Sequence, residues 1–171
     1  DKTIDYTYDL LDRCISSYDP LGQATRTAYD ENDNQILDQT YDALHPDQSA
    51  PNFQRNTQAQ FDGWKQPIKT ANRFVGQLLA DIDADSKLTP QQKADAKQLV
   101  WQQQAVQQHF DASSGLLLSK RNSLGGTTLF YYDIERRPIF KIKSTGAIKQ
   151  IVYNRFHEDV ADYGFYNRVP A

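Results

Sequence analysis

The sequence has little of what defines several common functional classes. Only one of its 171 residues is a cysteine, Cys14, so no disulfide can form within the chain. Acidic residues outnumber basic ones and the net charge is -3, whereas nucleic-acid-binding proteins usually carry a basic stripe. No apolar run approaches the length of a membrane span. These shortages argue against a disulfide scaffold, a general nucleic-acid binder and a membrane-spanning helix.

Motifs for catalysis are missing as well. The sequence contains no Gly-x-Ser-x-Gly elbow, no His-Glu-x-x-His pattern and no phosphate-binding loop. The three histidines, His45, His109 and His157, are scattered, and we expect His109 to end a helix. Cys14 lies in a strand-like run, where a small buried hydrophobe is expected rather than a nucleophile. The sequence therefore predicts no catalytic residue and no enzyme.

Aromatic residues are plentiful and some are evenly spaced. Ten tyrosines and eight phenylalanines suit a half-buried sheet surface. Tyr8 and Tyr29, each followed by Asp, lie 21 residues apart, and so do Tyr132 and Tyr153. Phe110, also followed by Asp, lies 22 residues before Tyr132 and is expected to begin a further unit. A fixed period of this kind indicates a repeated structural unit.

Between these aromatic residues the pattern predicts short strands joined by turns. Asp19-Pro20-Leu21-Gly22 is a turn signal, because proline fixes φ and glycine accepts a positive φ. The polar stretch 42–60, with Pro46 and Pro51, is predicted to be a loop. The predicted strands cover residues 3–8, 14–18, 24–29, 35–41, 116–118, 127–132, 139–143 and 147–153.

The middle of the chain has a helical pattern instead. Thr89-Pro90-Gln91-Gln92 predicts a helix start with a capping box, and the helix is expected to run to about Phe110. The residues expected to be buried on the two helices are Ala71, Phe74, Val75, Leu78, Leu79, Ile82, Ala96, Leu99, Val100, Val106 and Phe110. We therefore predict an α+β fold, with a helical hairpin at 63–110 inserted between β segments at 1–62 and 111–171.

The repeated pieces resemble the Rhs or YD-repeat family, whose pattern is Tyr-Asp, a Gly-Arg pair, a strand, a turn, a second strand and Tyr-Asp again. The matching pieces cover about half of the chain. Three departures are present: Asp12 and Glu135 stand where Gly usually precedes Arg, and Asn154 replaces the third Asp. These departures leave the geometry of the corresponding turns open.

The resemblance implies a fold and a role. Repeats of this family build a β-sheet ribbon that spirals into a hollow shell, which encloses a toxic domain in bacterial Rhs toxins and in the B and C components of Tc toxins; animal teneurins use a similar shell. The resemblance thus implies antiparallel β-hairpin repeats in a non-catalytic, secreted or cell-surface bacterial protein. The implied partners are other repeats of the same shell and the enclosed toxin domain. Because the sequence starts in a strand-like pattern, we expect a fragment of a longer protein.

One motif suggests a metal site. Asp81, Asp83 and Asp85 stand at alternate positions between two predicted helices, as in the calcium loop of an EF-hand. Ser86 replaces the glycine of that loop, and Gln92 replaces the closing glutamate that supplies two charged oxygens. An acidic loop between two helices is therefore the favoured interpretation, with weak calcium binding as the alternative and no other cofactor.

A binding surface is the alternative to a purely structural role. Arg136, Arg137, Lys141, Lys143 and Lys149 form a modestly basic group on predicted strands. Lysines often protect the edges of sheets, and a surface for a sugar, a polyanion or a partner protein is the second interpretation. The two tryptophans, Trp64 and Trp101, could stack on a sugar, although Trp101 fits a helix interface better.

Overall fold

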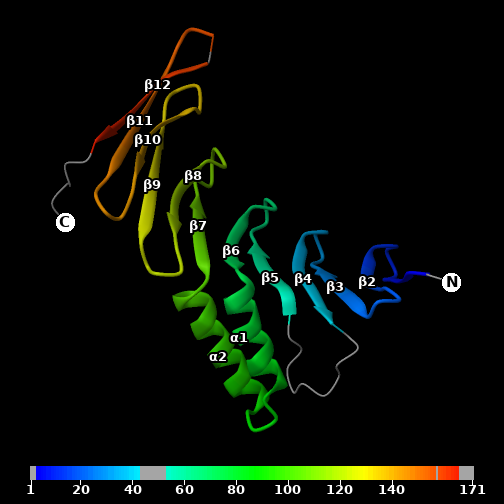
Figure 1. Ribbon diagram of the computed structural model, residues 1–171. Helices are drawn as coiled ribbons and strands as arrows, with labels where there is room; N and C mark the ends of the chain where they lie inside the picture. The colour runs from blue at the N-terminus through cyan, green and yellow to red at the C-terminus, as the bar shows by residue number, and fades with distance from the viewer. Residues whose placement is uncertain (1–2, 43–52, 157, 166–171) are drawn as a thin grey trace. The chain divides into compact units, whose positions relative to one another are not determined.

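The computed structural model describes residues 3–42, 53–156 and 158–165, which form two compact units (Figure 1). The first unit is Asp1–Ala105 and the second is Val106–Ala171. The described residues form antiparallel strands and two helices, as the α+β expectation requires. None of the described helices is long and apolar enough to cross a membrane.

In the first unit, consecutive strands pair with one another in antiparallel fashion. The strands are β1 (Asp5–Tyr8), β2 (Cys14–Tyr18), β3 (Gln23–Tyr29), β4 (Gln35–Asp42), β5 (Phe53–Phe61) and β6 (Pro67–Ala71). The predicted loop at 42–60 is wrong over its second part, since β5 lies there; Pro46 and Pro51 lie outside the described residues. Strand β5 has few strand-forming residues, so its pairing with β4 and β6 and its cover by helix α1 decide its structure.

The two helices are α1 (Arg73–Ala84) and α2 (Pro90–Gln103). Asn72 caps α1, because its side chain accepts hydrogen bonds from two backbone N–H groups of the first turn. The capping box predicted at Thr89 and Gln92 is confirmed, with Pro90 in the first turn of α2. The first turn of each helix is thus fixed by side-chain hydrogen bonds.

The helices occupy less of the chain than the predicted range 63–110. Residues Pro67–Ala71 form strand β6, and α2 stops at Gln103 before strand β7 (Val106–Phe110). The prediction that His109 ends a helix is therefore wrong, since His109 is an exposed strand residue. The glutamines of this region are compatible with either state, and pairing with the next strand selects the extended one.

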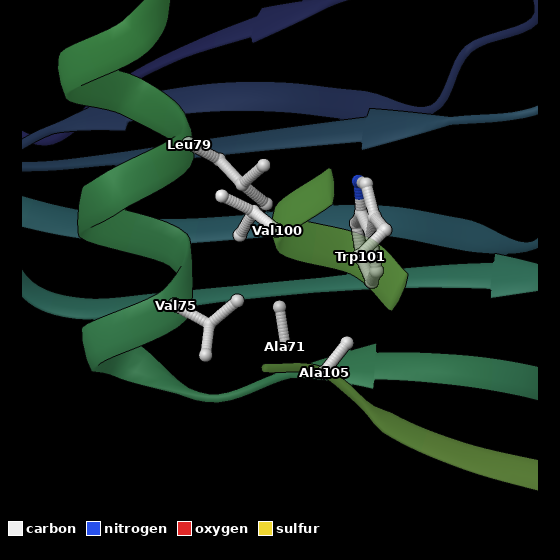
Figure 2. Close-up of a cluster of buried hydrophobic side chains, with 6 residues drawn as sticks. All are labelled: Ala71, Val75, Leu79, Val100, Trp101 and Ala105. Atoms are coloured by element: carbon white, nitrogen blue, oxygen red, sulfur yellow. The ribbon is translucent and has the colours of Figure 1, made fainter. Parts of the chain in front are cut away.

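Helix α1 covers the sheet face formed by β5 and β6, α2 packs on α1, and together they enclose the core of the first unit (Figure 2). This core cluster consists of Ala71, Val75, Leu79, Val100, Trp101 and Ala105. Two residues expected to be buried are exposed instead, Phe74 by 83% and Leu99 by 51%. Because α1 begins at Arg73, its buried side follows Val75 and Leu79, four residues apart, and Phe74 falls outside it.

A glycine sets how closely α1 approaches the sheet. A Cβ atom on Gly76 would lie 2.4 Å from the backbone oxygen of Asn56 on β5 and 2.7 Å from its side-chain oxygen. Asn56 is fully buried, and its side chain accepts a hydrogen bond of 3.3 Å from Gln39 on β4. The absence of a side chain at Gly76 therefore permits direct contact between helix and strand backbones.

The second unit also consists of strands that pair antiparallel with their neighbours in sequence. After β7 come β8 (Leu117–Arg121), β9 (Thr127–Tyr132), β10 (Pro138–Ile142), β11 (Ile148–Tyr153) and β12 (Asp159–Phe165). Aromatic and β-branched residues on these strands favour the extended backbone.

Candidate functional site

One turn geometry recurs between successive strands, and the turn at Asp133 shows it fully. The backbone N–H of Asp133 donates to the carbonyl oxygen of Arg137 at 3.0 Å. Its Oδ1 atom accepts from the N–H groups of Glu135 and Arg137, both at 2.9 Å. The fourth residue, Arg136, has a positive φ of 65°. One carboxylate therefore organises a connection of three residues, the last of which is left-handed.

The same bonds recur in both units. In each case the first residue donates its N–H to the fifth carbonyl, and its side-chain oxygen accepts from the third and fifth N–H groups. These turns begin at Asp9, Asp19, Asp30, Asp62, Asn122 and Asn154. The turn at Asp111 is one residue longer, with its carboxylate bound to the N–H groups of Ser113 and Ser114.

The departures from the repeat pattern do not disturb this geometry. Asp12 has a positive φ of 58° without being glycine, and Asn154 supplies a side-chain amide oxygen in place of a carboxylate oxygen. The structure corrects one assignment: the left-handed residue of the second pattern is Arg136, not Glu135. Hydrogen bonds around the turn offset the cost of a left-handed backbone at a residue with a side chain.

A further aromatic-aspartate pair was missed in the sequence. Phe61 ends β5 and Asp62 begins a turn with the same hydrogen bonds, with Lys65 at a positive φ of 61°. Phe61 lies 32 residues after Tyr29 instead of 21, because a longer segment joins β4 to β5. The signal was the Phe-Asp pair itself, which is identical to Phe110-Asp111.

The evenly spaced tyrosines link each turn to the next strand pair. The hydroxyl of Tyr153 donates to the carbonyl oxygen of Pro138 at 2.9 Å, and that of Tyr132 donates to Leu117 at 2.8 Å. A longer bond of 3.4 Å joins Tyr29 to the carbonyl oxygen of Cys14, and all three bonds span 15 residues. The period in the sequence is thus a repeated cross-strand contact.

Arginines at two of the turns add a second contact to these tyrosines. The guanidinium of Arg137 lies 4.6 Å from the ring centre of Tyr153, and that of Arg13 lies 4.7 Å from the ring of Tyr29. Arg13 also donates to Asp33 in the following turn at 2.6 Å. A cation over an aromatic face is attracted by the ring quadrupole. Each arginine therefore joins its own turn to the tyrosine that ends a later strand of the same unit.

The carboxylates that begin the arginine-containing turns are held in the charged state. Partial burial raises the pKa of Asp9. Hydrogen bonds from the backbone and the side chain of Arg13 together lower this pKa by more than burial raises it, so the net pKa lies below its usual value. The pKa of Asp133 is lowered in the same way, with burial opposed by the backbone and side chain of Arg137. Each bond favours the ionised carboxylate.

Two further turn carboxylates are stabilised by neutral donors. The side-chain amide of Asn34 is the largest influence that lowers the pKa of Asp30. Hydroxyls of Ser113 and Ser114 hold the pKa of Asp111 well below its usual range. Neutral donors thus make the largest contributions that lower these two pKa values, with a smaller Coulombic contribution from Lys65 at Asp30.

Acid should weaken the fold through these carboxylates. A folded-state pKa below the unfolded value contributes stability that is present above about pH 4 and is lost as the pH falls through the folded pKa. We expect the melting temperature to fall below about pH 4, and to fall less steeply in a fourfold Asp→Asn variant at Asp9, Asp30, Asp111 and Asp133. Asn serves at this turn position in Asn122 and Asn154, so the variant should fold. Identical pH slopes in calorimetric melting would contradict the expectation.

The tyrosine hydroxyls should contribute measurably to stability. We expect Tyr153→Phe and Tyr132→Phe each to lower the free energy of unfolding by about 1 kcal/mol, as loss of a hydrogen bond does. Tyr29→Phe should cost less, because its bond is 3.4 Å long. Tyr163→Phe is the matched control, since Tyr163 is exposed. Urea unfolding tests the series, and equal effects at all four positions would exclude a role for the hydroxyl bonds.

The predicted calcium ligands do not converge in the structure. Asp81 accepts a hydrogen bond from Gln77 within α1, Asp83 pairs with Lys97 at 2.8 Å, and Asp85 follows the end of α1. Among the residues that the structure describes, no group of three or more His, Cys, Asp or Glu side chains is placed to hold a metal ion.

The basic strand residues are only partly brought together. Lys141, Lys143 and Lys149 line a cavity of about 300 Å³ in the second unit, together with Gly164 and Phe165 among others. In contrast, Arg137 pairs with Asp133 and Glu135 in its own turn.

The remaining candidates of the sequence lie apart from one another. Cys14 is partly buried at the start of β2, and its thiol lies 3.5 Å from the carbonyl oxygen of Ser16. Trp64 is exposed on the turn that begins at Asp62, whereas Trp101 is buried in the core cluster. His45 and His157 lie outside the described residues.

Comparison with known proteins gives a match in fold. No protein-family model and no curated protein matches the sequence. The crystal structure of TcdB2-TccC3-Cdc42 aligns with 99% of this chain at a TM-score of 0.53 and 14% identity. A Tc holotoxin pore from Photorhabdus luminescens also aligns with 99% of the chain, at a TM-score of 0.53 and 16% identity.

In both alignments the chain spans 9% of the length of the solved chain. At this level of identity the likeness concerns the fold, and it agrees with the serial antiparallel strands described above. The chain therefore shares the fold of the aligned segments of these Tc toxin structures, in agreement with the resemblance of its sequence.

Proposed function

We propose that this chain is a non-catalytic structural segment of a toxin-associated shell. The observation that carries the proposal is the recurrence of one side-chain-organised turn between successive antiparallel strands. Each turn returns the chain to pair with the strand before it, and the tyrosine and arginine contacts fix the next pair. Repeats of this kind bury a continuous surface only when they are stacked on their neighbours. This property fits a protein that forms the wall of a shell.

In this proposal the aromatic-aspartate pairs are YD repeats that form hairpins. The proposed repeat starts are Tyr8-Asp9, Tyr29-Asp30, Phe61-Asp62, Phe110-Asp111 and Tyr132-Asp133, with Tyr153-Asn154 as a variant, whereas Tyr18-Asp19 and Tyr41-Asp42 are pairs of the same type within the repeats. The fold shared with TcdB2-TccC3 structures supports partners within a toxin complex. The proposed partners are other repeats of the same shell and a toxin domain that the shell encloses or presents, in a secreted or cell-surface bacterial protein.

A wall segment needs further strands at its ends. Among the residues that the structure describes, strand β1 is paired with β2 alone in the first unit, and β12 is paired with β11 alone in the second. Tyr6 and Tyr8 on β1 are more than half exposed, so this edge strand presents large aromatic side chains to solvent. In a longer wall these edges would pair with neighbouring repeats.

The isolated chain should therefore associate through its edges. We expect sedimentation velocity to show dimers or larger species that increase with protein concentration. Tyr6→Lys should suppress this association, because a charged edge opposes strand pairing, whereas Leu124→Lys, at an exposed turn, should not. A strictly monomeric profile at high concentration, or equal effects of the two substitutions, would count against the proposed role.

A further inference from the structure

A polar cavity lies beside α2 in the first unit. Its volume is about 390 Å³, within the range of small-molecule sites. Its lining comes from the two helices and from β5 and β6, and comprises Gln58, Gln60, Lys69, Asp83, Ala94, Lys97, Gln98 and Trp101. None of these residues takes part in the repeated turns, so the wall-forming role leaves the cavity without an explanation.

Trp101 places an unused hydrogen-bond donor at this cavity. The residue is only 9% exposed and belongs to the core cluster, where Figure 2 shows its indole beside the aliphatic side chains. The indole N–H donates to no other described residue, and its nitrogen is not among the fully buried atoms without a partner, so the donor is open to an acceptor from outside the chain. Because only 9% of Trp101 is exposed, little of its ring is accessible for stacking, and the N–H is the polar group that it offers to a ligand.

Among the residues that the structure describes, three other polar side chains at the cavity also lack a hydrogen-bond partner. Gln60 and Lys69 lie directly opposite each other on β5 and β6, and Gln98 approaches from α2. The side chains of these three residues form no hydrogen bond with any part of the chain that the structure describes. Asp83, by contrast, is already paired with Lys97 at 2.8 Å.

The chemistry of these groups restricts the ligand. The indole N–H and the ammonium group of Lys69 can only donate, so a ligand must bring acceptor oxygens. Lys69 and Lys97 outnumber the single carboxylate of Asp83, which favours a negative charge on the ligand. The glutamine amides donate and accept, which suits hydroxyl groups.

We propose that this cavity binds a small hydroxylated carboxylate of the acidic-monosaccharide class. The carboxylate pairs with Lys69, an oxygen accepts from the indole N–H of Trp101, and ring hydroxyls exchange hydrogen bonds with Gln60 and Gln98. The site shares no residue with the repeated turns, so it can be tested separately from the proposed wall function.

The test uses the indole resonances of the whole 171-residue chain. The sequence has only two tryptophans, and Trp64 is exposed on a turn, so it provides an internal reference. In nitrogen-proton correlation spectra, sodium glucuronate should displace the Trp101 indole signal in a saturable manner and leave the Trp64 signal in place. A spectrum of Trp64→Phe assigns the two signals.

Matched substitutions and probes decide the outcome. Lys69→Met should weaken glucuronate binding by roughly tenfold or more, because it removes a charged hydrogen-bond partner. Lys87→Met, in the exposed loop between the helices, should leave binding unchanged. The proposal is overturned if the Trp101 signal does not respond, if glucose or acetate displaces it equally, if an aspartate-rich peptide binds more tightly, or if both lysine variants behave alike.

Discussion

Leu79→Ala should lower the free energy of unfolding by about 3 to 4 kcal/mol. Leu79 is 1% exposed and lies at the centre of the core cluster beneath α1. The substitution removes buried methyl groups and leaves a cavity, and both losses add in a well-packed site. The first unit has few other buried apolar side chains, so the cluster has little capacity to collapse around the space.

The measurement is urea unfolding followed by circular dichroism and by tryptophan fluorescence, to which buried Trp101 contributes. The matched control is Leu99→Ala on α2, where the side chain is 51% exposed and the cost should stay below about 1 kcal/mol. Equal losses for the two leucines would show that the cluster does not hold the helices on the sheet.

Gly76→Ala should also destabilise the fold, by about 2 to 3 kcal/mol. In an ordinary helix this change is favourable by up to about 1 kcal/mol, so the expected sign is the reverse of helix propensity. The added Cβ would lie 2.4 Å from the backbone oxygen of Asn56, and a backbone atom cannot move aside as a flexible side chain can. The helix must therefore shift away from β5 and lose packing.

Thermal unfolding of Gly76→Ala and Gly63→Ala makes the comparison. Gly63 has nothing within 4 Å of an added Cβ, so its substitution should change stability by less than about 0.5 kcal/mol. Adding Asn56→Ala to Gly76→Ala should bring no recovery, because the nearest obstacle belongs to the main chain. A stabilised Gly76→Ala protein would mean that α1 does not rest on β5.

The sequence predicted local structure well where one residue type determines it. The capping box at Thr89 needs only neighbours in the same turn, and the structure contains it. In the repeated turns the aspartate side chain bonds to N–H groups two and four residues later, so short patterns such as Asp19-Pro20-Leu21-Gly22 were sufficient. Hydrogen bonds between residues close in sequence can therefore be predicted from short sequence patterns.

Other features depend on residues far apart in the sequence and could not be predicted. Strand β5 is polar and becomes a strand because β4 and β6 pair with it and α1 covers it. The end of α2 was placed too late, since the glutamines before Val106 carry no stop signal. The cavity beside Trp101 joins residues from two strands and two helices, and no spacing in the sequence marks it.

The turn design separates folding from surface chemistry. Its backbone hydrogen bonds use the side chain of the first residue and the main chain of the others, so they do not require particular side chains at the second and third residues, although Glu135 and Ser113 add contacts of their own at two of the turns. At these positions the chain carries exposed large apolar residues such as Leu10, Trp64, Leu124 and Ile134. Substitutions at these turn positions should therefore change stability little. Related proteins could carry different binding surfaces along this edge of the sheet, and short peptides could be inserted there without a redesign of the fold.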